Sequence, residues 1–208
     1  MKEYQTYLFD FDGTLVDSHD SLALVFKGAY GAVGVEVPDD FIITLMRVPL
    51  PVGYEALNGP KDEEKIQLFA SEIIRLLDDK EVLKATRAFD DVRDTLYTLY
   101  QKGKTLGIVT SNNVKHVGEV LDFLEIDRHM FSVIIGNKEV KRHKPFPDPV
   151  LKAFEVLNIG PEGVCYVGDG QDDMTSAKDS NVTPILLDRR NEYHDSPYQV
   201  IYSLEELI

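Results

Sequence analysis

The sequence contains few positively charged residues compared with negatively charged ones. Only 22 lysine and arginine residues stand against 36 aspartate and glutamate residues, which leaves a formal net charge of -14. Such an excess of negative charge argues against nucleic acid or an anionic membrane surface as the main partner. An anionic substrate would need a metal ion or a local cluster of cationic side chains to overcome that background.

Cysteine and long apolar runs are also nearly absent. Cys165 is the single cysteine in the sequence, so no disulfide forms within the chain. No stretch reaches the about 18 apolar residues that a membrane-spanning helix needs. Residues 1–5 lack the apolar core of a signal peptide. We therefore expect a cytoplasmic protein that does not bind membranes.

Hydrophobic periodicity divides the chain into two kinds of sequence. Between about residues 17 and 85, apolar residues recur at helical spacing and no strand pattern appears. The rest of the chain alternates amphipathic helical segments with short apolar runs that are typical of buried strands. These runs lie at residues 7–9, 105–110, 131–135, 164–167 and 184–187.

This alternation predicts an α/β fold, in which a Rossmann-like parallel sheet carries helices on both faces. The run at 7–9 belongs to the same pattern as the later runs, so the helical stretch is an insertion after the first strand. We therefore predict an α/β core from residues 1–16 and 86–208, and an inserted helical cap from residues 17–85. Within the insertion, the proline-containing stretch 47–53 predicts a turn-rich break between helices.

The first apolar run ends in two aspartates, Asp10 and Asp12, which are followed by Gly13 and Thr14. Two carboxylates at a buried strand end repel each other unless a cation or a proton intervenes. A divalent metal ion with oxygen ligands is the simplest resolution, and one carboxylate then becomes available as a nucleophile. The pattern therefore indicates metal-assisted covalent chemistry at this strand end.

Three further strand ends carry groups that suit phosphate chemistry. Thr110, Ser111 and Asn112 follow the second run and offer hydroxyl and amide donors. Lys144 lies in a basic loop after the third run, and the fourth run leads into the acidic segment 169–173. Ligands of parallel sheets bind beyond the carboxyl ends of the strands, so these segments converge on one edge. Carboxylates, a lysine and hydroxyls together suit phosphoryl transfer.

In this order the four segments resemble the four motifs of the haloacid dehalogenase-type hydrolase superfamily. The similarity extends from Tyr7 to about Asp188 and is particularly high between Lys144 and Asp169. It looks closest to the phosphoglycolate phosphatase-like branch, which carries a helical cap between the first and second motifs. The resemblance implies a Mg²⁺-dependent phosphatase that acts on small phosphate monoesters, such as phosphoglycolate-like acids or sugar phosphates.

The resemblance also implies catalytic roles. Asp10 would attack the phosphorus and form an aspartyl-phosphate. Asp12 would protonate the leaving alcohol and then take a proton from the hydrolytic water. Lys144 would neutralise the intermediate and orient Asp10. Thr110 and the backbone amide of Ser111 would hold the phosphate oxygens.

Mg²⁺ is the cofactor that the resemblance implies. Its ligands would be the carboxylates of Asp10 and Asp169 and the backbone carbonyl of Asp12. Asp173 would support the metal directly or through water, and Asp172 is the alternative for that place. Both of these acids also suit the first turn of a helix, where the helix dipole favours negative charge.

In the cap, Arg47 is the residue best suited to touch substrate, because it precedes a proline-containing loop in a region expected to face the site. Val48 stands where relatives frequently carry glycine, which leaves the identity of the leaving group open. A cap that closes and excludes water predicts small substrates rather than phosphoproteins. In the core, Asn181 replaces a usual glycine after the last helix, and asparagine tolerates the left-handed conformation that a helix end needs.

Two other functions stay open at this point. A sugar-phosphate mutase on the same scaffold would keep its aspartyl-phosphate from water until the sugar reorients. A non-catalytic module that binds phosphate ligands would be signalled by loss of the motif carboxylates or lysine, all of which are present. The expected partner is a small phosphorylated metabolite, and the expected assembly is a monomer or a weak homodimer.

Overall fold

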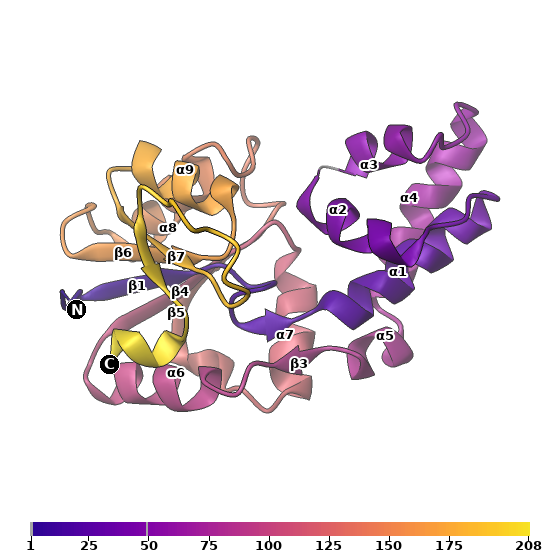
Figure 1. Ribbon diagram of the computed structural model, residues 1–208. Helices are drawn as coiled ribbons and strands as arrows, with labels where there is room; N and C mark the ends of the chain where they lie inside the picture. The colour runs from indigo at the N-terminus through magenta and orange to yellow at the C-terminus, as the bar shows by residue number, and fades with distance from the viewer. Residues whose placement is uncertain (1, 49) are drawn as a thin grey trace. The chain divides into compact units, whose positions relative to one another are not determined.

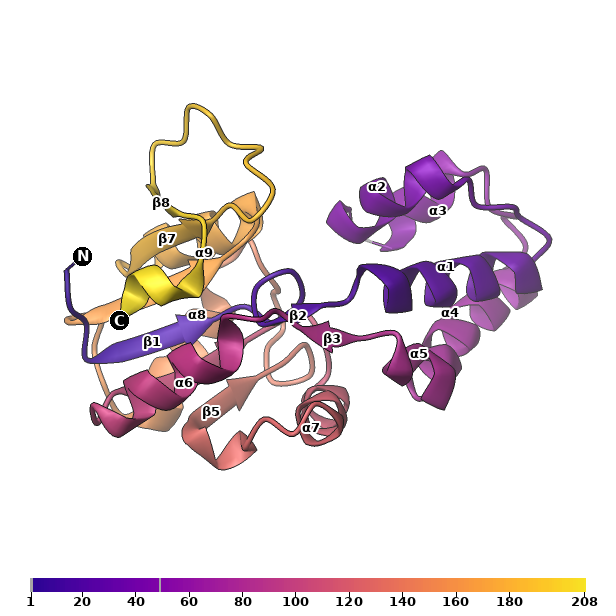
Figure 2. The same cartoon turned by 60° about the horizontal axis from the view of Figure 1, so that its bottom comes forward.

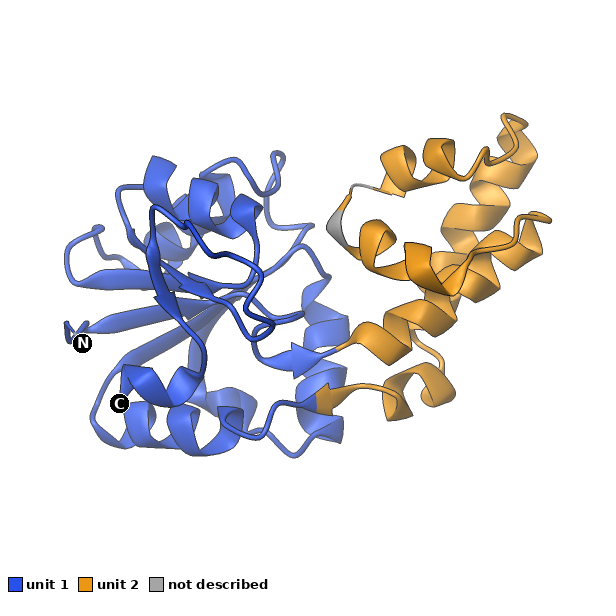
Figure 3. Ribbon diagram, in the orientation of Figure 1, with its two compact units in different colours: residues 1–17, 88–208 blue, residues 18–87 orange. Residues whose placement is uncertain are grey.

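The computed structural model describes residues 2–48 and 50–208, except for the side chain of Arg47. The chain forms two compact units, which Figure 3 colours separately. The first unit combines residues 1–17 with residues 88–208, and the second consists of residues 18–87. In the described part of the chain, no helix has the length and apolar character needed to cross a membrane.

A six-stranded sheet forms the centre of the first unit (Figure 1). All of its strands run parallel, in the order β5-β4-β1-β6-β7-β8. The strands are β1 (Thr6–Phe9), β4 (Thr105–Val109), β5 (Phe131–Ile135), β6 (Val164–Gly168), β7 (Thr183–Leu187) and β8 (Gln199–Ile201). The predicted parallel α/β sheet is confirmed. β8 was not predicted, because its three residues change from exposed Gln199 to buried Ile201 and form no apolar run.

Helices cover both faces of this sheet. Figures 1 and 2 show α8 (Asp148–Leu157) and α9 (Gln171–Asp179) on one face and α6 (Val92–Gln101) on the other. α8 packs against β4 and β5, while α9 packs against β6 and β7. α6 packs against β4 and the short helix η3 (Leu204–Leu207), and α7 (Val114–Phe123) packs against η2 (Arg128–Met130). Because the central strands are covered on both sides, every residue of β1 and β6 is buried.

The end of α9 has the conformation that the sequence predicts. Asn181 follows the helix with a φ of +59°, which lies in the left-handed region. Its backbone N–H donates to the carbonyl of Lys178 at 3.0 Å, which satisfies one of the carbonyls at the helix end. The prediction for Asn181 is therefore confirmed.

The second unit is helical. Its elements are α1 (His19–Ala32), η1 (Asp39–Phe41), α2 (Ile42–Arg47), α3 (Leu50–Ala56), α4 (Glu63–Leu77) and α5 (Lys80–Lys84). α1 packs along α4, and the rings of Tyr30, Tyr54 and Phe69 meet in the core with centroids 4.7 to 5.9 Å apart. A separate two-stranded sheet, formed by β2 (Val16–Asp17) and β3 (Arg87–Ala88), marks the two places where the chain passes between the units.

The break between helices that was predicted for the stretch 47–53 is shorter than predicted. α2 ends at Arg47, Val48 is extended, and α3 already begins at Leu50. Pro51 lies in the first turn of that helix, where a proline removes no intrahelical hydrogen bond. Gly53 lies within α3, and a Cβ atom there would come within 2.6 Å of the Leu45 side chain. The proline thus meets the local demands of a helix, and the glycine allows the close approach of Leu45.

Candidate active site

The carboxyl ends of three neighbouring strands gather the predicted motif residues. Asp10, Thr110 and Asp169 come directly after the ends of β1, β4 and β6. These strands are adjacent in the order β4-β1-β6. The backbone N–H of Asp10 donates to the carbonyl of Val167 at 2.8 Å, which continues the hydrogen bonding between β1 and β6. The three side chains therefore start from the same edge of the sheet.

Lys144 reaches this edge from the loop between β5 and α8. Its Nζ lies 2.6 Å from Oδ1 of Asp10 and 2.6 Å from Oδ1 of Asp173. The exposed fraction is 8% for the side chains of Lys144 and Asp10 and 5% for that of Asp173. Burial alone would lower the pKa of Lys144, but the charges of Asp10 and Asp173 raise that pKa well above its ordinary value. Lys144 therefore stays positively charged between the two carboxylates.

Three carboxylates crowd together at this point. One oxygen each of Asp10, Asp169 and Asp173 lies within 4.8 Å of the others. Burial raises the pKa of Asp10 well above its ordinary value, and the charges of Asp173 and Asp169 add to this effect while Lys144 opposes it. Burial, followed by the charge of Asp173, raises the pKa of Asp169 to about 7. Carboxylates crowded in this way favour a cation among them.

The cluster fits a hard divalent cation such as Mg²⁺. Carboxylate oxygens are the protein ligands that Mg²⁺ prefers, and it is commonly held by one or two of them together with water and substrate oxygens. Asp10, Asp169 and Asp173 supply such oxygens at close range. The carboxylate of Asp12 is not part of this group and instead accepts from Nδ2 of Asn112 at 2.6 Å. A contribution of its backbone carbonyl to the metal stays a prediction.

The structure separates the two acids at the start of α9. Asp173 is buried, whereas Asp172 is exposed. Oδ1 of Asp173 accepts hydrogen bonds from Lys144 at 2.6 Å and from the hydroxyl of Tyr166 at 3.0 Å. Its Oδ2 accepts from the backbone N–H of Gly170 at 3.1 Å. The cluster therefore contains Asp173 and leaves Asp172 outside.

Tyr166 is a residue of this site that sequence reasoning missed. It lies in β6, its side chain is fully buried, and its hydroxyl is 2.9 Å from the carbonyl oxygen of Val109 as well as 3.0 Å from Asp173. A hydroxyl has one proton, so it donates to one of these two acceptors at a time. A tyrosine in a central, fully buried strand is a usable signal, since a buried phenol needs a hydrogen-bond partner.

Two glycines allow the carboxylates to approach. A Cβ atom on Gly13 would lie 2.3 Å from Oδ2 of Asp169, and the φ of Gly13 is +79°. A Cβ atom on Gly168 would lie 2.5 Å from the Cβ of Asp173. Any side chain at either position would push a carboxylate away from the cluster. These glycines are therefore part of the site, although they carry no functional group.

Asn112 joins Asp12 to Thr110. The Nδ2 of Asn112 donates to Oδ2 of Asp12 at 2.6 Å, and its backbone N–H donates to Oγ1 of Thr110 at 3.1 Å. Thr110 is buried and Asp12 is half-buried, while Ser111 is exposed. The segments that follow β1 and β4 are therefore linked directly by one side-chain hydrogen bond, from Asn112 to Asp12.

Arg47 is the one predicted site residue whose side chain lies outside the described part of the structure. Its backbone ends α2 in the helical unit, and Val48 follows in an extended conformation. Contact between Arg47 and substrate stays a prediction.

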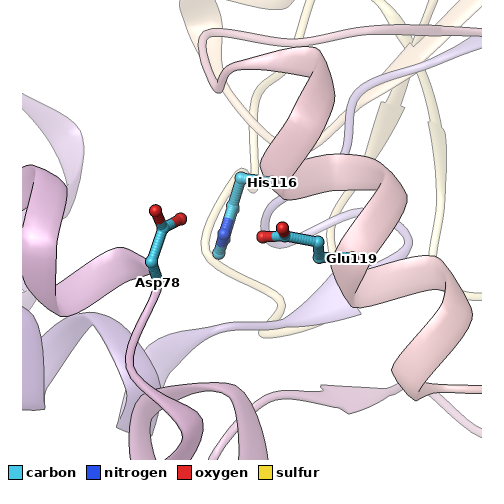
Figure 4. A group of neighbouring side chains, drawn as sticks. All are labelled: Asp78, His116 and Glu119. Atoms are coloured by element: carbon cyan, nitrogen blue, oxygen red, sulfur yellow. The ribbon is translucent and has the colours of Figure 1, made fainter.

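Figure 4 draws a further group of acidic and histidine side chains. His116 and Glu119 are three residues apart on α7 and project from the same side of that helix. Asp78, which is also drawn, belongs to the helical unit, in the segment between α4 and α5. Two donors on one helix are fewer than the three or four protein ligands of a zinc site. We therefore assign no metal to His116.

Comparison with known proteins gives consistent matches along the chain. A family model described as "Haloacid dehalogenase-like hydrolase" matches residues 7–187. The phosphoglycolate phosphatase of Escherichia coli is 34% identical over 226 residues, which cover 96% of this chain and 89% of that protein. A protein of Caldanaerobacter subterraneus named "Putative pyrophosphatase PpaX" is 31% identical over 184 residues, with 86% and 80% covered. The crystal structure of a "Putative haloacid dehalogenase-like hydrolase" from Bacteroides fragilis superposes with a TM-score of 0.88 at 29% identity, and covers 99% of this chain and 100% of its own.

Proposed function

Because this chain belongs to the haloacid dehalogenase-like hydrolase family, we propose that it is a Mg²⁺-dependent phosphatase that hydrolyses small phosphate monoesters through an aspartyl-phosphate on Asp10. The observation that carries this proposal is the position of Lys144. Its ammonium lies 2.6 Å from both Asp10 and Asp173, inside a cluster of buried carboxylates. In this arrangement Lys144 orients the carboxylate of Asp10 and places a positive charge where the negative charge of a phosphoryl group would lie.

In the first half of the reaction, an oxygen of Asp10 attacks the phosphorus and the bond to the ester oxygen breaks. Asp12 donates a proton to that oxygen, so the leaving group departs as a neutral alcohol. Asp12 then takes a proton from a water molecule whose oxygen attacks the phosphorus of the aspartyl-phosphate. The bond between Asp10 and phosphorus breaks, which releases inorganic phosphate and restores both aspartates.

Asp10, Asp169 and Asp173 are the side chains that would hold Mg²⁺, and the backbone carbonyl of Asp12 is the further ligand that the family resemblance implies. When bound, the metal offsets charge on the phosphoryl oxygens as the transition state develops. Lys144 contributes a second positive charge from the protein itself. Thr110 and the backbone amide of Ser111, at the end of β4, are the groups we assign to the remaining phosphate oxygens.

The helical unit, residues 18–87, would act as a cap that excludes bulk water from the substrate. Exclusion of water protects an acyl phosphate and favours small esters over phosphoproteins. The named activity of the Escherichia coli relative supports a small carboxylated ester such as phosphoglycolate as the first substrate to assay. We expect the protein to work in the cytoplasm.

Phosphate release from a panel of small phosphate esters tests the proposal. The panel is assayed with Mg²⁺ and with EDTA, for the wild type and for Asp10→Asn. We expect metal-dependent release by the wild type and none by the variant. Exposed Asp172 provides the matched control, since Asp172→Asn alters a neighbouring acid outside the cluster and should retain activity.

Two results would contradict the proposal. Release that persists in Asp10→Asn would exclude the aspartyl-phosphate. No release from any ester would remove the phosphatase activity, and conversion of a sugar phosphate into its isomer without release would favour a mutase instead.

A further inference from the structure

We propose that Asn112 is a positioning residue for Asp12, which it holds in the orientation needed to protonate the leaving alcohol. This inference rests on the proposed function, because it assigns a task within the same reaction. No motif of the sequence analysis gave Asn112 a role of its own beyond the donors that follow the second strand.

The contact between the two side chains is short. Nδ2 of Asn112 donates to Oδ2 of Asp12 at 2.6 Å. A carboxyl oxygen without a proton accepts such a bond whether the group is ionised or carries its proton on the other oxygen, so the contact fits both states of Asp12 in the reaction. The bond joins two segments that are 100 residues apart in the sequence. It therefore ties the loop after β1 to the loop after β4.

The backbone of Asn112 is itself fixed on both sides. Its N–H donates to Oγ1 of Thr110 at 3.1 Å, and its carbonyl accepts from the N–H of Asn137 at 2.8 Å. A Cβ atom on Gly136 would lie 2.5 Å from that carbonyl, so the glycine allows the two loops to meet. The next residue, Asn113, caps α7 by accepting from Lys115 and His116.

These contacts fix the position of the Asn112 amide, and the amide in turn orients the Asp12 carboxylate. The backbone around Asp12 is also ordered, since the N–H of Gly13 donates to the carbonyl of Val16 at 2.8 Å. A carboxylate that turned freely about its last side-chain bond would face the leaving oxygen for only part of the time. General acid catalysis contributes about 10²–10⁴-fold to a rate, and a displaced acid forfeits a share of that factor.

The size of the leaving-group effect separates positioning from structural damage. An alkyl phosphate such as phosphoglycolate releases a poor leaving group, which needs a proton from Asp12 as its bond to phosphorus breaks. p-Nitrophenyl phosphate releases a stable phenolate, which needs almost no proton. The ratio kcat/KM covers the steps up to departure of the leaving group, so it reports on this proton transfer and not on the later attack of water.

Asn112→Ala and Asn112→Leu are the test variants. The first removes the amide, while the second keeps a side chain of similar size and loses the donor without adding a charge next to Asp12. For both we expect kcat/KM to fall by roughly 10- to 100-fold on the alkyl phosphate and by less than about 3-fold on p-nitrophenyl phosphate. Asn113→Ala is the matched control, because it removes an adjacent asparagine that caps a helix, and it should affect both esters equally.

The outcomes distinguish this inference from the proposed function. If the wild type shows Asp10-dependent turnover but the Asn112 variants lose equal factors on both esters, or lose nothing, the positioning role is overturned while the phosphatase stands. If the wild type releases no phosphate from these two esters or from any other ester of the panel, the proposed function fails and the role of Asn112 fails with it. Should Asn112→Ala fold poorly, Asn112→Leu gives the same comparison without a cavity.

Discussion

Arg189→Met should lower the free energy of unfolding by about 3 kcal/mol, because Arg189 neutralises a buried carboxylate. Its two terminal nitrogens each lie 2.9 Å from an oxygen of Asp91, and the exposed fractions of the two side chains are 15% and 9%. Nη2 of Arg189 also donates to the carbonyl of Thr14 at 3.0 Å. The guanidinium carbon lies 4.0 Å from the centre of the Phe89 ring.

The size of the expected loss in unfolding free energy follows from the contacts that Asp91 keeps when Arg189 is replaced by methionine. Removing one partner of a buried ion pair costs about 3–5 kcal/mol, because the remaining charge has lost its counterion. Asp91 keeps two donors, the hydroxyl of Ser203 at 2.9 Å and the N–H of Leu204 at 2.8 Å, which places the cost near the lower end. The lost contact with Phe89 adds about 0.5 kcal/mol. Methionine preserves much of the packing of the arginine stem, so a cavity contributes little.

Urea unfolding followed by circular dichroism at neutral pH measures the difference. Arg190→Met is the matched control, because Arg190 is the exposed neighbour of Arg189 and its replacement should change stability by less than about 0.5 kcal/mol. A loss below about 1 kcal/mol in Arg189→Met, or an equal loss in the control, would refute the reasoning, since surface substitutions already produce changes of that size.

Low pH should remove the difference in unfolding free energy between Arg189→Met and the wild type. Burial alone would raise the pKa of Asp91, but hydrogen bonds from Arg189 and Leu204 lower that pKa below its ordinary value of 3.8. A carboxyl with a lowered folded pKa stabilises the protein above its unfolded pKa, and this stabilisation is lost as the pH falls through the folded pKa. The difference in unfolding free energy should therefore be full above about pH 5 and shrink below pH 3.8. A constant difference throughout this window would contradict the assignment.

Two further predictions concern the carboxylate cluster. Gly13→Ala should reduce kcat/KM by at least about 100-fold, because its Cβ atom would lie 2.3 Å from Asp169. Gly34 has a similar positive φ with open space around it, so Gly34→Ala should retain activity. An equal loss of activity in both variants would point to backbone strain instead. Asp173→Asn should raise the Mg²⁺ concentration needed for half-maximal activity by about 10- to 100-fold, while Asp172→Asn should leave it unchanged. Titration of activity with Mg²⁺ measures this concentration for both aspartate variants. An equal rise in the Mg²⁺ requirement of Asp172→Asn would contradict the assignment of the two acids.

The strands that the sequence revealed are those that form clear apolar runs, and of these only β5 lies at an edge of the sheet. β1, β4 and β6 are buried on both faces, so their sequences are continuous apolar runs with clear ends. β8 lies at the edge of the sheet and only Ile201 is buried, which leaves no such pattern. α3 was missed for a different reason, because proline is common both in loops and in the first turn of a helix, so Pro51 is compatible with either structure. Neighbouring sequence alone does not choose between them.

The candidate site was predictable in its residue types and in the edge of the sheet where they meet. Asp10 and Asp169 directly follow strand ends, Asp173 lies in the first turn of the helix that follows β6, and the carboxyl ends of parallel strands meet at one edge of the sheet. The contact of Lys144 with Asp10 was expected from the family resemblance alone, and its contact with Asp173 was not predicted, since Lys144 lies in a loop whose path no periodicity describes. The same holds for the bond between Asn112 and Asp12, which depends on how two loops 100 residues apart meet. Tyr166 looked like core, because the strand pattern records burial and not where a hydroxyl points.

The carboxylate cluster has a consequence for electroneutrality. With all groups ionised, Asp10, Asp169 and Asp173 carry three negative charges and Lys144 one positive charge, so the buried group has an excess of two negative charges. An ion of valence two balances this excess, whereas a monovalent ion leaves it half compensated. The pKa of about 7 at Asp169 indicates the competing route to balance, which is uptake of protons. A divalent ion and protons would therefore be alternative counterions for the same buried excess of negative charge.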